Sequence, residues 1–140
     1  MKRHVVLLGD SIFDNGAYTG REPDVATHLS TLLPEWRTSL LAVDGSTISN
    51  LPDQLGGVPE DASHLVISIG GNDALLNSDL LELPARSTAE ALEMFARRIA
   101  DFESGYRDAI ARLCGSACRP RSAPSTTATS PIPGTPGWRG

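Results

Sequence analysis

The chain has 140 residues, 40% of them hydrophobic, which is enough for one domain with a buried core. Its net charge of −5 argues against nucleic acid or an anionic membrane as a partner, and no apolar stretch is long enough to span a bilayer. Cys114 and Cys118 are too few for a disulfide framework. The apolar run after the basic start MKR is too short for a signal peptide, so we expect a cytoplasmic protein.

Short apolar runs alternate with helical patterns along the first seventy residues. Val5–Leu8 is apolar and ends at a glycine, which predicts a buried parallel strand. A helix is predicted from Asp24 to Leu32, and Ser39–Val43 is predicted as the second strand. Ser49–Leu55 is predicted to be helical, and Leu65–Ile69 is predicted as the third strand.

One long amphipathic helix is predicted after these elements. Ser87–Glu90 reads as a capping box, and apolar residues then recur every three or four positions as far as Leu113. The resulting order of strand, helix, strand, helix, strand, helix predicts an α/β fold, with a parallel sheet covered by helices on both faces.

The composition changes at residue 114. All 17 Asp and Glu residues lie in residues 1–113, whereas residues 114–140 hold three Arg and five of the ten Pro. We therefore predict one domain over residues 1–113, incomplete at its C-terminal side. Residues 114–140 are interpreted as a disordered tail or as out-of-frame sequence.

Three polar turns follow the three predicted strands. Gly9-Asp10-Ser11 follows the first strand, Asp44-Gly45-Ser46-Thr47 the second, and Gly70-Gly71-Asn72-Asp73 the third. The carboxyl ends of parallel strands meet at one edge of a sheet, where ligands bind in open α/β folds. A serine at a helix start can act as a nucleophile, and backbone N–H groups and an Asn carboxamide can stabilise an oxyanion.

These turns resemble those of the SGNH, or GDSL-type, hydrolases, a family of serine esterases and lipases. The resemblance covers residues 4 to about 113 and rests on GDSIFDN, on the glycine after the second strand and on GGND after the third. It implies a flavodoxin-like three-layer fold, and Ser11 as the nucleophile that attacks small acyl esters or acylated sugars. It also implies an oxyanion hole made of the Ser11 and Gly45 N–H groups and the Asn72 side chain, with no cofactor and no metal. The remaining motif residues, Gly9, Asp10, Gly71 and Asp73, support the turns, and Asp10 is not the triad acid.

Each turn taken alone has a simpler interpretation. Gly-Asp-Ser is also an ordinary strand-to-helix turn with Asp or Ser as the N-cap, and Gly, Asn and Asp favour turns for conformational reasons. A nucleotide site at the same place lacks support, because the chain has neither G-x-G-x-x-G nor G-x-x-x-x-G-K-[ST]. The occurrence of all three turns in the right order favours the hydrolase interpretation.

The general base that a serine nucleophile needs is missing from the expected place. In the family it comes from a late Asp-x-x-His segment, whereas the three histidines here are His4, His28 and His64. Asp61–His64 has the right spacing, but His64 precedes the third strand and Asn72 follows it, about 16 Å apart. His4 precedes the first strand, and His28 is predicted on the first helix at the surface. The chain therefore lacks the family's Asp-His pair, and we expect low activity or none.

A shifted reading frame would explain both the missing pair and the unusual tail. Residues 122–133 can be encoded so that another frame reads CTIYNGNFPDP, a strand followed by a turn. We hypothesise that the frame slips near residues 113–115, which would make the two cysteines artefacts and not a metal site. The alternative is a truncated, non-catalytic module that binds an ester, a glycan or a partner through the same pocket, and a purely structural domain is a third interpretation.

Overall fold

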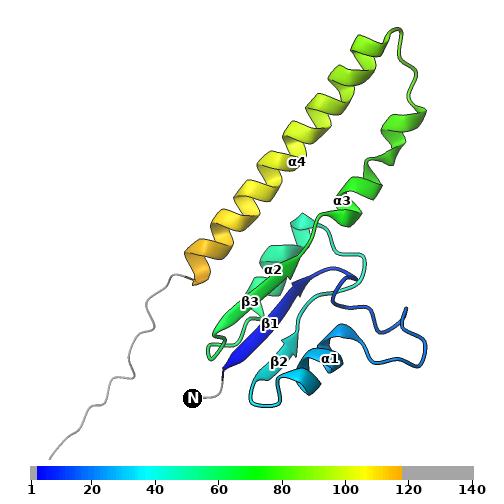
Figure 1. Ribbon diagram of the computed structural model, residues 1–140. Coiled ribbons are helices and arrows are strands. Elements are labelled where there is room, and N and C mark those ends of the chain that lie inside the picture. Colours follow the sequence, from blue (N-terminus) through cyan, green and yellow to red (C-terminus); the bar gives the residue numbers. More distant parts are fainter. Residues whose placement is uncertain (1–2, 118–140) are drawn as a thin grey trace, which may run out of the picture.

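The computed structural model describes residues 3–117. Its centre is a three-stranded parallel sheet of β1 (His4–Gly9), β2 (Arg37–Leu40) and β3 (His64–Ser68), in the order β2-β1-β3. All three strands therefore end at the same edge, and β1 lies between the other two (Figure 1). The predicted α/β class with a parallel sheet is confirmed.

Helices lie on both faces of this sheet. The helix α1 (Val25–Leu32) packs against β2, on the face that carries Val5 and Leu7. The opposite face is covered by the 3-10 helix η1 (Ile48–Asn50), by α2 (Leu51–Gly56) and by the last turns of α4 (Thr88–Ala117). The sheet is thus the middle of three layers, as expected.

The hydrophobic core lies on the α2 side of the sheet. Alternation along a strand sends Val6 and Leu8 to this face, and both are fully buried. They pack with one buried residue of η1, one of α2 and two of α4, namely Ile48, Leu51, Ala109 and Leu113. The long helix is therefore anchored to the domain by its C-terminal part.

The second strand begins earlier than predicted. The Ser39–Val43 interpretation followed the apolar residues, but the ladder with β1 starts where the Arg37 N–H donates to the Arg3 carbonyl at 2.8 Å. Past Leu40 the pairing is irregular, because the Leu41 and Ala42 N–H groups both donate to the Leu7 carbonyl. The Val43 N–H then donates to the Gly9 carbonyl. Because β2 is an edge strand, its first residues need not be apolar, and apolar content alone misplaced its start by two residues and its end by three.

The segment after β3 contains two short helices that the sequence did not reveal. They are α3 (Gly71–Leu76) and the 3-10 helix η2 (Ser78–Glu82), in a region interpreted only as a turn. α3 has no buried residue, and its two leucines are about 70% exposed. A six-residue helix without an apolar periodicity gives no helical signal.

The predicted capping box of α4 is only half formed. The Ser87 hydroxyl accepts the Glu90 N–H at 3.2 Å, as a cap should. The Glu90 carboxylate, however, accepts the Arg86 N–H and guanidinium instead of the Ser87 N–H, and this pairing lowers the Glu90 pKa. The prediction of a full box was wrong, although the start of the helix was right.

The helix α4 runs four residues past Leu113 to Ala117, and its N-terminal half extends beyond the carboxyl ends of the strands (Figure 1). The tail from Cys118 onward, including the segment of the frameshift hypothesis, lies outside the described residues. Within residues 3–117, no strand pairs with the outer edge of β3, and no helix has the length and apolar character needed to cross a membrane.

Candidate active site

The first predicted turn directly continues β1. The backbone of Gly9 has a φ of +123°, and the next N–H, of Asp10, donates to the Ser68 carbonyl of β3 at 3.0 Å. The buried Asp10 carboxylate accepts the Ile12 N–H at 3.1 Å, so it shapes the turn from inside. Ser11 is half-buried in this turn, and its hydroxyl makes no hydrogen bond within residues 3–117.

The second turn is held from outside by the loop that follows Ser11. The Asp44 N–H donates to the Asp14 carboxylate at 2.8 Å, and the Tyr18 hydroxyl donates to the Asp44 carboxylate. The hydrogen bond to Asp44, followed by the charge of that carboxylate, raises the Tyr18 pKa. Gly45 is next in the chain and is exposed, with no heavy atom within 4 Å of the place where a Cβ would stand. Its backbone is therefore accessible.

The third turn contacts both of the others. Asn72 Nδ2 donates to the Ser46 carbonyl at 2.9 Å, which fixes the carboxamide beside the Gly45 turn. The Asp73 carboxylate accepts the Ile48 N–H at 3.0 Å, two residues farther along the same segment. A Cβ on Gly71 would lie 3.9 Å from Asp10 Oδ2, so this turn also lies against the first one.

The structure thus brings the three predicted turns to one edge of the sheet. An amide nitrogen carries two N–H groups, and only one of those of Asn72 is used by the Ser46 carbonyl. The arrangement offers an unengaged hydroxyl, an accessible backbone turn and one further amide donor. These are a nucleophile and oxyanion donors of the kind that acyl transfer to a serine uses, without the general base that it also needs.

One residue of this edge was not predicted. Gln54, on α2, is buried and bonds to the main chain of Gly9 in both directions: the Gly9 N–H donates to Oε1 at 2.7 Å, and Nε2 donates to the Gly9 carbonyl at 2.8 Å. Nε2 also lies 3.2 Å from Ser46 Oγ. The sequence feature that could have indicated it is a polar residue on the same helix face as Leu51 and Leu55, which point toward the core.

The histidines lie away from this edge, as predicted. His4 and His64 begin β1 and β3, whereas the Ser11 turn follows the end of β1. The five steps from His4 to Gly9, at about 3.3 Å each, put His4 about 16 Å from that end. His28 is exposed on α1. Within the described residues, no imidazole is hydrogen-bonded to the Ser11 hydroxyl.

Asp61 bonds to His4 and not to His64. Its carboxylate lies 3.0 Å from His4 Nδ1, while His4 Nε2 lies 2.9 Å from Ser39 Oγ. The bond to His4, together with the positive charge of Arg37, lowers the Asp61 pKa. Because His4 is fully buried, these contacts satisfy a core histidine at the amino ends of the strands.

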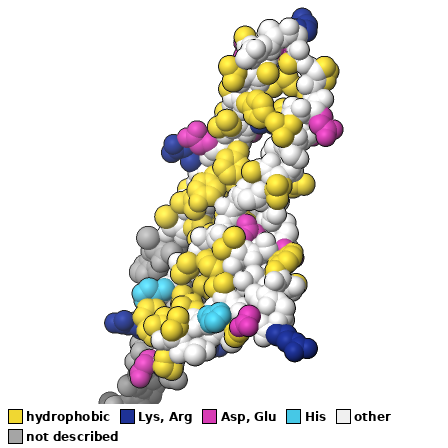
Figure 2. All heavy atoms as spheres, turned by 45° about the vertical axis from the view of Figure 1, so that its right-hand side comes forward, with side chains coloured by type: hydrophobic (Ala, Val, Ile, Leu, Met, Phe, Trp, Pro, Cys, Tyr) yellow, Lys and Arg dark blue, Asp and Glu magenta, His cyan; other side chains and the backbone are white. Residues whose placement is uncertain are grey.

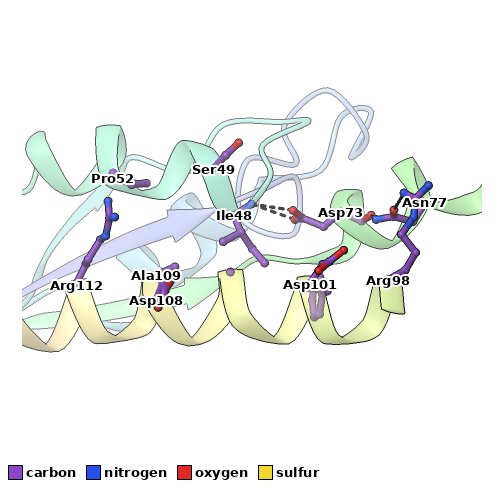
Figure 3. Close-up of a pocket in the computed structure, with 12 residues that line it drawn as sticks. Ile48, Ser49, Pro52, Asp73, Asn77, Arg98, Asp101, Asp108, Ala109 and Arg112 are labelled. Carbon is purple, nitrogen blue, oxygen red and sulfur yellow. Dashed lines mark hydrogen bonds between the residues drawn. The ribbon is translucent and has the colours of Figure 1, made fainter. Parts of the chain in front are cut away.

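One cleft lies beside this edge and not on it. It has a volume of about 580 Å³ between α4 and the η1–α2 segment, and Figure 3 shows Arg98, Asp101 and Arg112 lining its α4 side. Asp73 lines it too, but Ser11, Gly45 and Asn72 do not. In residues 3–117, no group of three His, Cys, Asp or Glu side chains is arranged to hold a metal ion.

No protein-family model matches the chain, and no curated protein sequence matches it either. The solved structures that are similar to this chain include two of one esterase. One is the crystal structure of AlinE4, an SGNH-hydrolase family esterase, at 21% identity and a TM-score of 0.43, covering 74% of this chain and 55% of that one. The other is a mutant of AlinE4, at the same identity and TM-score, with 84% and 73% covered. The chain thus spans about half the length of the first of these, and a likeness this distant identifies no reaction.

Proposed function

We propose that this chain carries the nucleophile and oxyanion hole of a serine hydrolase that cleaves small carboxylic esters. The supporting observation is the hydrogen bond from Asn72 Nδ2 to the Ser46 carbonyl. It joins the second and third turns at the carboxyl edge of the sheet, where the first turn presents Ser11.

In the proposed reaction, Ser11 Oγ attacks the ester carbonyl and the hydroxyl proton passes to solvent, because no imidazole of the described residues is hydrogen-bonded to Ser11. The C–O bond to the alcohol then breaks and leaves an acyl-enzyme, which water hydrolyses. The Ser11 and Gly45 N–H groups and the second Asn72 N–H are proposed to hold the developing oxyanion. One such donor is worth about 3–4 kcal/mol of transition-state stabilisation.

Without an imidazole base, the turnover of this chain is expected to be slow. Within the described residues, the Asp10 carboxylate is not hydrogen-bonded to the Ser11 hydroxyl and accepts the Ile12 N–H instead. An activated ester such as p-nitrophenyl acetate suits the test, because its leaving group departs without being protonated.

The test is the release of p-nitrophenolate by the purified full chain. The wild type is expected to release p-nitrophenolate faster than buffer does, and Ser11→Ala is expected to remove this excess. Ser104→Ala, which changes an exposed serine on α4, should leave the release unchanged. Equal release by all three proteins would show that Ser11 is not a nucleophile.

The position of the histidines favours a second candidate function, a non-catalytic module that binds an ester or an acylated glycan at the same edge. Binding of a slowly hydrolysed ester analogue that Asn72→Ala weakens, with no release that depends on Ser11, would select this candidate.

A further inference from the structure

We propose that Gln54 is a positioning residue that sets the Ser11 turn and the Gly45 turn relative to each other. The inference rests on the proposed function for its catalytic meaning, but its structural content can be tested separately. Within the described residues, Gln54 makes no hydrogen bond to Ser11. It acts through Gly9, the first residue of the Ser11 turn, and through Ser46, the residue after Gly45.

The pairing of Gln54 with Gly9 fixes the end of β1. A carboxamide has one acceptor and one donor side, and Gln54 uses both on a single residue, as a neighbouring strand would. The Gly9 carbonyl also accepts the Val43 N–H at 3.0 Å, so it receives one bond from α2 and one from the residue before Asp44. The end of β1 is thus fixed just before the turn that carries Ser11.

The contact of Gln54 with Ser46 connects α2 to the second turn. Gln54 Nε2 reaches Ser46 Oγ at 3.2 Å, while the carbonyl of the same serine accepts Asn72 Nδ2. Ser46 is 6% exposed, so its polar atoms depend on protein partners. A continuous chain of bonds therefore runs from Gly9 through Gln54 and Ser46 to Asn72, and it links all three turns.

Because Gln54 is buried, the loss of its hydrogen bonds should be costly. Gln54 is 9% exposed, so water has little access to replace either of its bonds, and removing one partner leaves buried polar groups unsatisfied. Rate depends steeply on the relative position of nucleophile and oxyanion donors, so a shift of one turn against the other should slow acylation. It should not weaken ester binding to the same degree.

The experiment compares the full-length wild type with Gln54→Met, Gln54→Glu and the control Asp53→Asn, which changes an exposed neighbour on α2. Amide hydrogen exchange is followed by NMR at Gly9 and Ser46, with Val6 in the core of β1 as the reference for global unfolding. Gln54→Met removes both halves of the carboxamide. Gln54→Glu keeps the acceptor for the Gly9 N–H but loses the donor to the Gly9 carbonyl and to Ser46 Oγ. The Ser46 N–H donates to the Val43 carbonyl, so its exchange reports the order of the second turn.

In Gln54→Met, exchange at Gly9 and Ser46 is expected to accelerate at least about tenfold relative to Val6. In Gln54→Glu, only Ser46 should accelerate, and Asp53→Asn should match the wild type. Equal changes at all three amides, or an unchanged Ser46 in both variants, would overturn the proposal. If Gln54→Glu does not fold, Gln54→Met alone decides it.

The catalytic effect of Gln54 is measured as the rate of acylation by p-nitrophenyl acetate. We expect Gln54→Met to lower the maximal rate about tenfold or more, while the ester concentration that gives half this rate stays the same. An unchanged rate would refute the positioning role. A wild type that is never acylated at Ser11 would refute the proposed function, and the amide exchange would still decide whether Gln54 links the turns.

Discussion

Replacing Gly9 with alanine should disrupt the end of β1 more than any ordinary glycine replacement. A Cβ on Gly9 would overlap the Ser68 carbonyl oxygen and lie 2.6 Å from the carbonyl carbon, where real Cβ atoms keep at least 3.0 Å from their neighbours. The obstacle is backbone, so no side-chain rotation can relieve it. β1 and β3 would have to separate at the point where the Asp10 N–H donates to Ser68.

Two costs add in this variant. A positive φ disfavours a residue with a Cβ by about 1–2 kcal/mol, and forcing an extra methyl group into a packed place costs about 1–3 kcal/mol. We therefore expect Gly9→Ala to lower the free energy of unfolding by about 2–5 kcal/mol. This is a large share of the stability of an ordinary domain, about 5–15 kcal/mol.

The assay is urea unfolding followed by circular dichroism, with Gly20→Ala as the matched control. Gly20 also has a positive φ, +65°, but nothing lies within 4 Å of its hypothetical Cβ, so this variant bears the conformational cost alone. The midpoint should fall clearly further in Gly9→Ala than in Gly20→Ala. If both variants lose the same stability, the close approach of Gly9 to Ser68 is not a feature of the protein.

Three further predictions concern polar contacts. Asp24 caps α1 by accepting the Thr27 N–H at 2.7 Å, so Asp24→Ala should lower the Tm by about 4 °C in a calorimetric scan, and an unchanged Tm would contradict the cap. Asp44 raises the Tyr18 pKa, so a spectroscopic titration of Tyr106→Phe should show a midpoint above that of free tyrosine. Asp44→Asn in the same background should remove this shift. The lowered Asp61 pKa means that its carboxylate stabilises the fold above pH 3.8 and that this contribution is lost as the pH falls further. The stability difference between wild type and Asp61→Asn should therefore shrink in acid, and a difference that grows there would refute the pairing with His4.

The fold could be predicted from the sequence where packing follows periodicity. β1 is apolar and buried because helices lie on both faces of the sheet, and the apolar runs Val5–Leu8 and Leu65–Ile69 located β1 and β3 to within one residue. β2 was misplaced because an edge strand can begin with the exposed Arg37. α3 was missed because it buries no residue, so no apolar pattern marks it.

The candidate site divides in a similar way. The turns after the strands could be located because parallel strands end at one edge of a sheet, and the structure brings Asn72 beside the Gly45 turn. Gln54 could not be assigned a partner, because its bonds to Gly9 span 45 residues and depend on where α2 lies over the sheet. The pairing of Asp61 with His4 was hidden for the same reason, since spacing suggested His64.

Exposed apolar side chains also distinguish this structure from an ordinary closed domain. Figure 2 shows hydrophobic side chains gathered along one face of the molecule, and the α4 residues Leu92 and Ile99 are at least 60% exposed. Surfaces of this kind favour association, so we expect the purified chain to self-associate with rising concentration in analytical ultracentrifugation. A monomer at all concentrations would contradict this expectation.

The most direct test of the central claim is to map where an activated ester acylates the folded full chain. After brief exposure to p-nitrophenyl acetate, peptide mass spectrometry should find the acetyl group on Ser11 in preference to the exposed Ser104. Asn72→Ala should slow this acylation about a hundredfold if its amide holds the oxyanion. Acetylation that is no faster at Ser11 than at Ser104, or that Asn72→Ala does not change, would contradict the account of this edge as a serine hydrolase site.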